Sequence, residues 1–321
     1  MLVVEYQNNE VVAYPSGEPV LFSPLPSAVT IGSFDGVHSG HRSIIARMNA
    51  IAHSRQLRSV VVTFEPHPRR VLSASASSSP LVLSTLDEKV ALLTALDVDL
   101  LFVVRFTDAF AARSSEDFII GVLVKLLCAK SIIVGYDHGF GRNRTGNTET
   151  LLHIGKEFGF DVEKISEVKI GNEHFSSTRI RKMLESGNIA DANQFLGYSY
   201  IVSGTVVDGD QRGRTIGFPT VNIKPSDPQK LLPHSGVYVA STDIGGILYK
   251  AMMNIGLRPT VSQGKEKTVE AHILGFSGEL YGSFLSFRLH AYIRDEKKFS
   301  TIDELKEQLE KDKKTVELYN E

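Results

Sequence analysis

Two histidines, His38 and His41, stand three residues apart in the stretch FDGVHSGH, just after the apolar run AVTIG. This spacing suits two ligands of a zinc ion on a helical turn, and it also suits two imidazoles that bind a phosphate group. Zinc needs a third and a fourth ligand; His67 in TFEPHP is one candidate, and nothing nearby in the sequence completes the set. The stretch alone therefore favours phosphate over zinc, and it leaves open that one histidine only caps a helix.

Glycines surround the two histidines at positions 32, 36 and 40. Glycine lets the backbone come close to a ligand, and a helix that starts here would offer free N–H groups to a phosphate. The Gly-x-Gly-x-x-Gly fingerprint of dinucleotide-binding turns is absent. The glycines thus agree with a phosphate site of another kind.

Alternating strand-like and helix-like segments must position these residues in the first half of the chain. Strands are predicted over residues 28–32, 59–64, 100–106 and 131–135, with a weaker one over 161–165. Helices are predicted over residues 41–54 and after Ser114 or Ser115. Strands that are apolar on successive residues are typical of a parallel sheet covered on both faces. The pattern predicts a doubly wound α/β domain, in which ligands bind beyond the carboxyl ends of the strands.

The second half has a different texture, with six short β-rich runs separated by Gly, Pro, Asp or Ser. Such spacing is typical of an antiparallel barrel or sandwich. A charged helix is predicted over residues 301–319 and is expected to pack on the outside of the barrel. Its apolar positions are Ile302, Leu305, Leu309 and Val316. We place the domain boundary near Ser186, which gives domains of residues 1–185 and 186–321.

Composition limits the classes of protein that remain. The 321 residues are 42% hydrophobic and 22% charged, with a net charge of −2, which argues against a broadly nucleic-acid-binding surface. The single cysteine, Cys128, excludes an internal disulfide and a Cys-rich zinc site. The start MLVVEYQNNE does not resemble a signal peptide, and no apolar stretch is long enough to span a bilayer. We therefore predict a cytoplasmic protein without a membrane or nucleic-acid partner; its oligomeric state, a homo-oligomer included, stays open.

Five segments of the first half resemble the nucleotidylyltransferase superfamily in the form found in bacterial FAD synthetases. They are GSFDGVHSGH, TFEPHPRRVL, DEKVALL, VGYDHGFGRNRTGN and FSSTRIRKML. The resemblance implies catalytic roles for His38, His41 and Arg181. It implies ATP binding by Gly32, Phe34, Asp35, Gly36, Ser176, Ser177 and Thr178, and flavin binding by Phe64, His67, Pro68, Asp137 and Phe140. Two positions depart from the family pattern: His138 stands where relatives have an aromatic residue, and Phe175 stands where they have a small aliphatic one.

The second half resembles the riboflavin kinase domain through GTVVDGDQRGRTIGFPTVNI, MNIGLRPT and VEAHILGFSGELYG. The resemblance implies that Glu270 is the catalytic carboxylate and that Thr220 and Asn222 hold the Mg²⁺ of MgATP, a suitable task for hard oxygen ligands. It also implies ATP binding by Gly209, Arg212, Gly213, Arg214 and Gly217, and flavin binding by Arg258 and Thr260. Gly275 stands where relatives generally have Asp, and Val221 replaces Ala.

These resemblances span nearly the whole chain and imply a bifunctional riboflavin kinase/FMN adenylyltransferase. Its substrates are riboflavin, FMN and ATP, its product is FAD, and Mg²⁺ is the expected cofactor. Adenylyl transfer starts from an anionic phosphate and needs positive charge and donors, whereas phosphorylation starts from a neutral hydroxyl and needs a proton acceptor. Two alternatives stay open: a monofunctional FAD synthetase with an inactive kinase-like barrel, and a flavin-sensing regulator that binds RNA.

Overall fold

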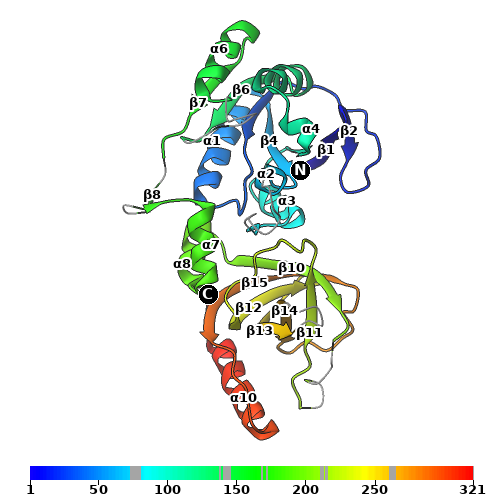
Figure 1. The fold of residues 1–321 in the computed structure, drawn as a ribbon, viewed down its shortest axis with the longest axis vertical. Coiled ribbons are helices and arrows are strands. Elements are labelled where there is room, and N and C mark those ends of the chain that lie inside the picture. Colours follow the sequence, from blue (N-terminus) through cyan, green and yellow to red (C-terminus); the bar gives the residue numbers. More distant parts are fainter. Residues whose placement is uncertain are drawn as a thin grey trace. The chain divides into compact units, whose positions relative to one another are not determined.

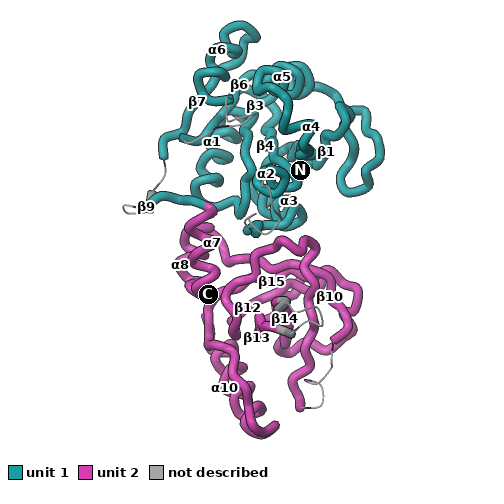
Figure 2. The backbone as a smooth tube through the Cα atoms, in the orientation of Figure 1, with its two compact units in different colours: residues 1–176 teal, residues 177–321 magenta. Residues whose placement is uncertain are grey.

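The computed structural model describes residues 1–72, 81–136, 139, 146–167, 169–170, 173–209, 213, 216–259 and 265–320. The chain divides into two compact units, residues 1–176 and 177–321 (Figure 2). Each unit has its own sheet. Among the described residues, no helix combines the length and the apolar composition that crossing a membrane requires.

The first unit is built on a seven-stranded sheet with the order β2-β1-β5-β4-β3-β6-β7 (Figure 1). Neighbouring strands run parallel except for β1 and β2, which form an antiparallel hairpin. The strands are β1 (Leu2–Gln7), β2 (Glu10–Ala13), β3 (Ser27–Ile31), β4 (Arg58–Glu65), β5 (Leu100–Arg105), β6 (Ala129–Val134) and β7 (Asp161–Lys164). The five strands predicted from the sequence are confirmed, and the hairpin that contains β1 was not predicted.

Helices and a second small hairpin complete this unit. They are α1 (Ser39–Arg55), α2 (Pro68–Leu72), α3 (Leu86–Thr94), α4 (Asp108–Ala111), α5 (Ser115–Phe118), η2 (Ile119–Leu126), α6 (Thr148–Phe158), β8 (Lys169–Ile170) and β9 (Glu173–His174). The predicted cap at Ser114 is present, since its side chain accepts a hydrogen bond from the Asp117 amide. The helix that it opens continues with the wider hydrogen bonding of a π-helix over η2.

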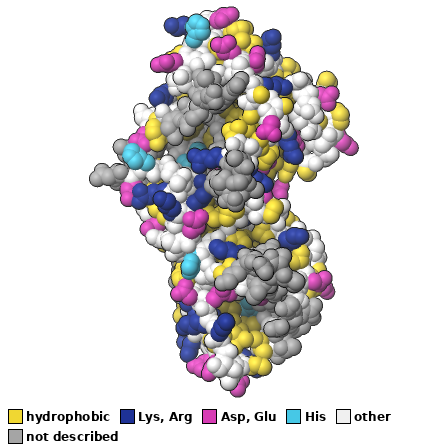
Figure 3. Space-filling view, in the orientation of Figure 1, with side chains coloured by type: hydrophobic (Ala, Val, Ile, Leu, Met, Phe, Trp, Pro, Cys, Tyr) yellow, Lys and Arg dark blue, Asp and Glu magenta, His cyan; other side chains and the backbone are white. Residues whose placement is uncertain are grey.

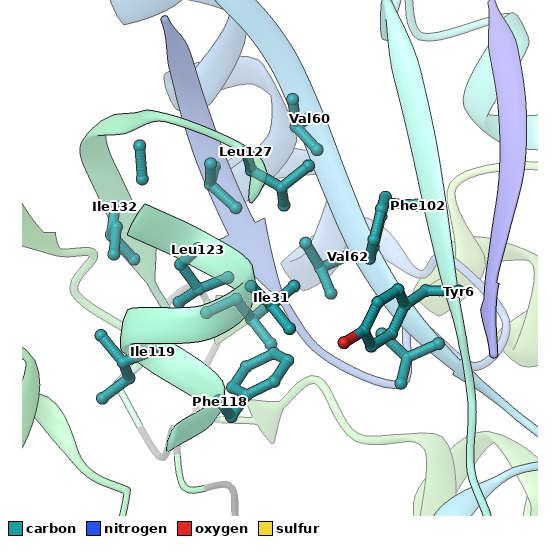
Figure 4. Packing of buried hydrophobic residues seen from close by; sticks show 14 of the residues in the cluster. Tyr6, Ile31, Val60, Val62, Phe102, Phe118, Ile119, Leu123, Leu127 and Ile132 are labelled. Atoms are coloured by element: carbon teal, nitrogen blue, oxygen red, sulfur yellow. The ribbon is translucent and has the colours of Figure 1, made fainter. Parts of the chain in front are cut away.

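The central strands are buried on both faces, as the continuous apolar runs predict. All five residues of β3 and the six central residues of β4 are buried. One face packs against α5 and η2 in the cluster of Figure 4, where Phe118 and Leu123 lie beside Ile31. Helix α1 contacts β3, β4 and β6, and its buried residues are not part of that cluster. The layers therefore fix the start of α1 at the carboxyl end of β3.

The second unit starts with two short helices, α7 (Ser177–Glu185) and α8 (Ile189–Leu196), and continues as a closed six-stranded barrel. All neighbouring strands of the barrel are antiparallel, in the order β10-β11-β14-β13-β12-β15. The strands are β10 (Tyr200–Val207), β11 (Val221–Pro225), β12 (Gly236–Ile244), β13 (Ile247–Pro259), β14 (Lys265–Ile273) and β15 (Phe284–Arg294). The predicted antiparallel barrel is confirmed.

The terminal helix α10 (Ile302–Leu318) packs on the barrel as predicted. Leu309 and Val316 join a cluster with outward-facing residues of β12 and β13, while Ile302 stays exposed. An ion pair fixes the same helix, since the Arg294 guanidinium donates to the buried Asp312 carboxylate over 2.6 Å. One side of the outer face of the barrel is thus covered.

Candidate active sites

The loop that joins β3 to α1 has an unusual backbone. Phe34, Gly36 and Val37 have φ angles of 45°, 79° and 36°, in the left-handed region that side chains rarely occupy. A side chain at Gly32 would meet the Phe34 ring at 3.2 Å, so this glycine lets the ring fold back toward the strand. Strain of this kind persists only where the surroundings hold the backbone in place.

The two histidines lie at the start of α1, directly after this loop. His38 is the N-cap of the helix, and its Nδ1 accepts a hydrogen bond from the His41 amide over 3.4 Å. The two imidazole rings stack, with centroids 3.6 Å apart and planes inclined by 15°. His38 therefore caps the helix, as the alternative interpretation of this stretch predicted. Capping leaves the rings at a helix N-terminus, where phosphate binding is favoured.

His41 has a buried ring nitrogen, Nδ1, that has no hydrogen-bond partner among the described residues. Burial holds the pKa of the His41 imidazole well below its usual value, and the adjacent His38 and Lys89 lower it further. An uncharged imidazole with an unused nitrogen can donate a hydrogen bond to a phosphate or take up a proton when one arrives.

Phe175, one of the two departures from the family pattern, packs against this pair. Its ring lies parallel to that of His38 at 6.3 Å between centroids, and a side chain at Gly40 would meet its Cβ at 3.2 Å. Phe175 is only 9% exposed. The large ring thus fills space beside His38 that the glycine leaves open.

Three of the predicted flavin-binding residues, Phe64, His67 and Pro68, lie at and after the end of β4. Phe64 is buried in an aromatic cluster with Phe106, Phe110 and Phe118. His67 uses its Nδ1 to accept a hydrogen bond from the Arg69 amide, at the start of α2, whose first residue is Pro68. Contact of these residues with a flavin remains a prediction.

The boundary between the two units falls inside the predicted phosphate motif. Phe175 and the exposed Ser176 end the first unit, and α7 begins the second with Ser177. Arg181 lies in the middle of α7 and is only 8% exposed. The roles of Ser177, Thr178 and Arg181 toward a nucleotide therefore remain predictions.

In the barrel, a row of three polar side chains crosses three neighbouring strands. Asn222 on β11 pairs in register with Glu270 on β14, which pairs on its other side with Asn254 on β13. Directly opposed residues share a face of a sheet, and the buried residues on either side of Glu270, Val269 and Ala271, point the other way. Glu270 therefore stands on the outer face between two amides.

The segment before β11 is fastened beside Glu270. His272 lies two residues further along β14, on the same face, and its Nδ1 is 2.7 Å from the Pro219 carbonyl oxygen. The Phe218 ring packs edge-on against His272 at 5.3 Å. Thr220 and Asn222, the predicted magnesium ligands, follow immediately and are partly exposed.

The donor set fits a magnesium ion. Thr220 offers a hydroxyl oxygen and Asn222 an amide oxygen, which are hard ligands. Glycines lie close to this segment: a Cβ at Gly209 would lie 1.9 Å from Asn222 Nδ2, and one at Gly213 would lie 2.1 Å from the Phe218 carbonyl oxygen. Both positions therefore require glycine.

Several predicted positions give less information. Asp137, His138, Phe140, Arg212, Arg214 and Thr260 lie outside the described residues. Arg258 is described only as part of β13, where it pairs with Glu266. Gly217 and Gly275 have φ angles of 87° and 72°, and an added Cβ would meet no atom within 4 Å, so backbone conformation accounts for glycine at both. Gly275 belongs to the turn after β14, outside the row that contains Glu270.

Comparisons with known proteins also divide the chain into two parts. Residues 23–179 match the family model of FAD synthetase, and residues 196–319 match that of riboflavin kinase. Bifunctional riboflavin kinase/FMN adenylyltransferases from Listeria monocytogenes and Escherichia coli K12 are 34% and 38% identical; the alignments cover 93% and 90% of this chain and 94% and 91% of those relatives. The chain belongs to the bifunctional riboflavin kinase/FMN adenylyltransferase family.

A solved structure supports the fold of this family member. The crystal structure of a macrolide-efflux protein from Streptococcus pneumoniae is 29% identical, matches all of both chains and has a TM-score of 0.84. The efflux name belongs to that protein, whereas two family models and the curated relatives agree on flavin chemistry for this family.

On the face drawn in Figure 3, Lys and Arg side chains are interspersed with Asp and Glu.

Three residues beside the sites were missed by sequence reasoning. Asn254 and His272 join Glu270 only through strand register, although the two-residue spacing of Glu270 and His272 was a signal for a shared face. Lys89 lies in the matched segment DEKVALL, but burial of its ammonium group beside the histidine loop could not be seen in the sequence.

Proposed function

We propose that this chain makes FAD from riboflavin in two ATP-dependent steps. The barrel transfers the γ-phosphate of ATP to riboflavin and gives FMN and ADP. The first unit transfers the adenylyl group of ATP to FMN and gives FAD and pyrophosphate. The sites occur along the chain in the reverse order of the reactions, so FMN must leave one site and enter the other.

For adenylyl transfer, we assign His38 and His41 to the phosphates of ATP. The FMN phosphate is already anionic, so it attacks the α-phosphorus without a general base, and the bond to the pyrophosphate breaks. Charge grows on the departing pyrophosphate, and preorganised donors stabilise such charge. The unused Nδ1 of His41 and the N-terminal amides of α1 support this role. Ser176, Ser177, Thr178 and Arg181 are proposed as further phosphate ligands.

For phosphorylation, we assign Glu270 as the proton acceptor for the ribityl hydroxyl of riboflavin. This nucleophile is neutral, so a carboxylate within hydrogen-bond reach increases its reactivity. Asn222 and Asn254 on both sides of Glu270 support a fixed carboxylate position. Gly209, Gly213 and Gly217, with Arg212 and Arg214, are proposed to surround the ATP phosphates.

Magnesium is proposed to be held in the barrel by Thr220 and Asn222. When bound with ATP, it would neutralise phosphate charge. The protein's own part is to present two hard oxygens beside the Glu270 carboxylate. Dialysis against a zinc-selective chelator, followed by addition of magnesium, should leave both rates intact; loss that only zinc restores would contradict the assignment of the histidines to phosphate.

We propose a functional boundary between residues 185 and 186, so that α7 with Arg181 goes with the first activity. Residues 1–185 should convert FMN to FAD, whereas residues 1–176 lack Arg181 and should not. Equal activity of the two folded fragments would reject this boundary. A cytoplasmic location also remains our proposal, consistent with the ATP that both reactions use.

The observation that carries the proposal is one chain with two chemically different sites: stacked histidines at a helix start, and a carboxylate between two amides on a barrel. The test is purified protein with riboflavin and MgATP, with flavins separated over time. FMN followed by FAD supports both activities. FAD formed only from supplied FMN supports the monofunctional alternative, and flavin binding without turnover supports the regulator.

A further inference from the structure

Lys89 is a buried ammonium group beside the histidine loop, and neither proposed reaction gives it a role. It is 3% exposed. Its Nζ donates to the Ser33 carbonyl oxygen over 2.9 Å and to Thr63 Oγ1 over 3.2 Å. Ser33 follows β3, and Thr63 belongs to β4. One charged group on α3 therefore joins the histidine loop to the neighbouring strand.

The same part of the chain holds the loop at further points. Asp35 Oδ1 accepts hydrogen bonds from the amides of Leu83 and Ser84, over 2.8 and 3.2 Å. The Gly36 amide donates to Ser84 Oγ over 2.9 Å. These contacts fall on the residues next to, or within, the left-handed part of the loop, where a fixed frame is needed to maintain the conformation.

Hydrogen bonds fix the start of α3, and they therefore fix the backbone position of Lys89. Thr85 caps the helix by accepting from the Glu88 amide, and the Glu88 carboxylate accepts from the Thr85 amide. This reciprocal pair fixes the first turn. Lys89 follows directly, with its Cα held by that turn.

A buried ammonium group is unfavourable unless it is paired and hydrogen-bonded. Burial lowers the pKa of Lys89, while the carboxylates of Glu65 and Asp35 oppose that shift. An apolar side chain of similar length would fill the same space without the free-energy cost of removing a charged group from water. What it could not supply is the pair of hydrogen bonds to Ser33 and Thr63, or a positive charge beside His41.

We propose that Lys89 is a positioning residue for adenylyl transfer, which holds the loop before α1 so that His38 and His41 meet the ATP phosphates in the productive geometry. The inference rests on the proposed function of the first unit. Because Lys89 acts through the histidines, its loss should reduce turnover more than substrate binding. Phosphorylation of riboflavin, which we assign to the barrel, should not change.

The test is Lys89→Met in the full chain, with both half-reactions measured. We expect kcat for FMN adenylylation to fall about 10- to 100-fold, as for an active group displaced by about 1 Å, with a smaller change in KM for ATP. The His41 imidazole resonance should titrate at higher pH than in the parent, because a positive neighbour has been removed. Thr63→Val removes one of the two acceptors and also the hydrogen bond that Thr63 Oγ1 donates to the Ser33 carbonyl oxygen over 3.1 Å. It leaves the hydrogen bond from Lys89 to Ser33 in place, so it should give a smaller loss of kcat.

Lys230→Met is the matched control. Lys230 is also a buried lysine, 4% exposed, but it lies in the barrel with its Nζ over the Tyr200 ring. The Lys230→Met variant should therefore carry out FMN adenylylation at the parent rate. If Lys89→Met only lowers the melting temperature, with kcat and the His41 titration unmoved, the inference is wrong. If its first unit does not fold, Thr63→Val decides, and a parent-like kcat in that variant overturns the inference. A parent chain without any adenylylation would instead reject the proposed function.

Discussion

The two candidate sites differ in the chemical groups that they present. The site at α1 brings together groups that favour anions: two imidazoles, the amides of a helix start and the nearby ammonium group of Lys89. The site on the barrel places a carboxylate at its centre, between two amide side chains. In the proposed mechanism, the site at α1 needs no proton acceptor because its nucleophile is already charged, and the site on the barrel needs one because its nucleophile is neutral.

The two sites also differ in how they are held. The histidines depend on a left-handed loop that side-chain hydrogen bonds from another segment keep in place. Glu270 is placed by the register of three paired strands. The difference teaches that a site on a loop requires a supporting frame, whereas a site on a barrel strand inherits its position from the sheet.

The largest effect is expected from a variant of the barrel site that stops one reaction and leaves the other intact. Glu270→Gln keeps the size and the hydrogen-bonding capacity but removes the proton acceptor, so riboflavin phosphorylation should fall by about two to four orders of magnitude. FMN supplied directly should still become FAD at the parent rate. Initial rates of both half-reactions measure this, with circular dichroism to verify folding. A parent-like kinase rate would show that the carboxylate is not the acceptor.

The converse variant is His41→Ala. Loss of one preorganised donor should reduce adenylyl transfer by roughly two to three orders of magnitude. Riboflavin phosphorylation should be nearly unchanged, and the same two assays measure both rates. A parallel fall of both activities would contradict the separation of the sites.

A smaller effect should come from Gly209→Ala. The added Cβ would overlap Asn222, so the amide must move, and we expect kinase activity to fall about 10- to 100-fold. The magnesium concentration for half-maximal rate should rise. Gly121→Ala is the matched control, since a Cβ there meets no atom within 4 Å. If Gly209→Ala needs no more magnesium than the parent, Asn222 is not a ligand.

The smallest effect concerns protonation. Because the pKa of His41 is held below its usual value, the imidazole should stay neutral as the pH falls from 8 through 6.5. The two-dimensional NMR spectrum of the imidazole protons measures this. The sign also predicts that the first unit loses stability as the pH falls below 6.5, where unfolded His41 binds a proton that the folded form excludes. Titration of His41 near 6.5 would contradict its buried, uncharged state.

Much of the architecture could be predicted from local pattern. Continuous apolar runs predicted the central parallel strands, and short runs between turns predicted the barrel. The β1–β2 hairpin was missed, although Asn8 and Asn9 both adopt positive φ and form the type of two-residue turn that asparagine favours. Its signal was present in the sequence, in the alternation on either side of the two asparagines.

The sites were predictable only in part. Motifs singled out His38, His41 and Glu270 as candidates, since a resemblance keeps residue types at fixed spacing. The contacts that hold them in place depend on long-range register and packing: Asn254 reaches Glu270 from the neighbouring strand, and Lys89 reaches Ser33 from another helix. Local pattern does not contain this information, because it arises only when distant segments pack.

The pairing of β1 has a consequence for synthesis on the ribosome. Leu2 pairs with Leu100, so the first strand made must wait for one that emerges much later. The barrel has the same property, because β10 pairs with β15 and closure requires residues up to the end of that strand. Such distant pairings fold slowly and expose unpaired edges in the interim. During translation, each unit therefore has a period in which an edge strand is available to other chains.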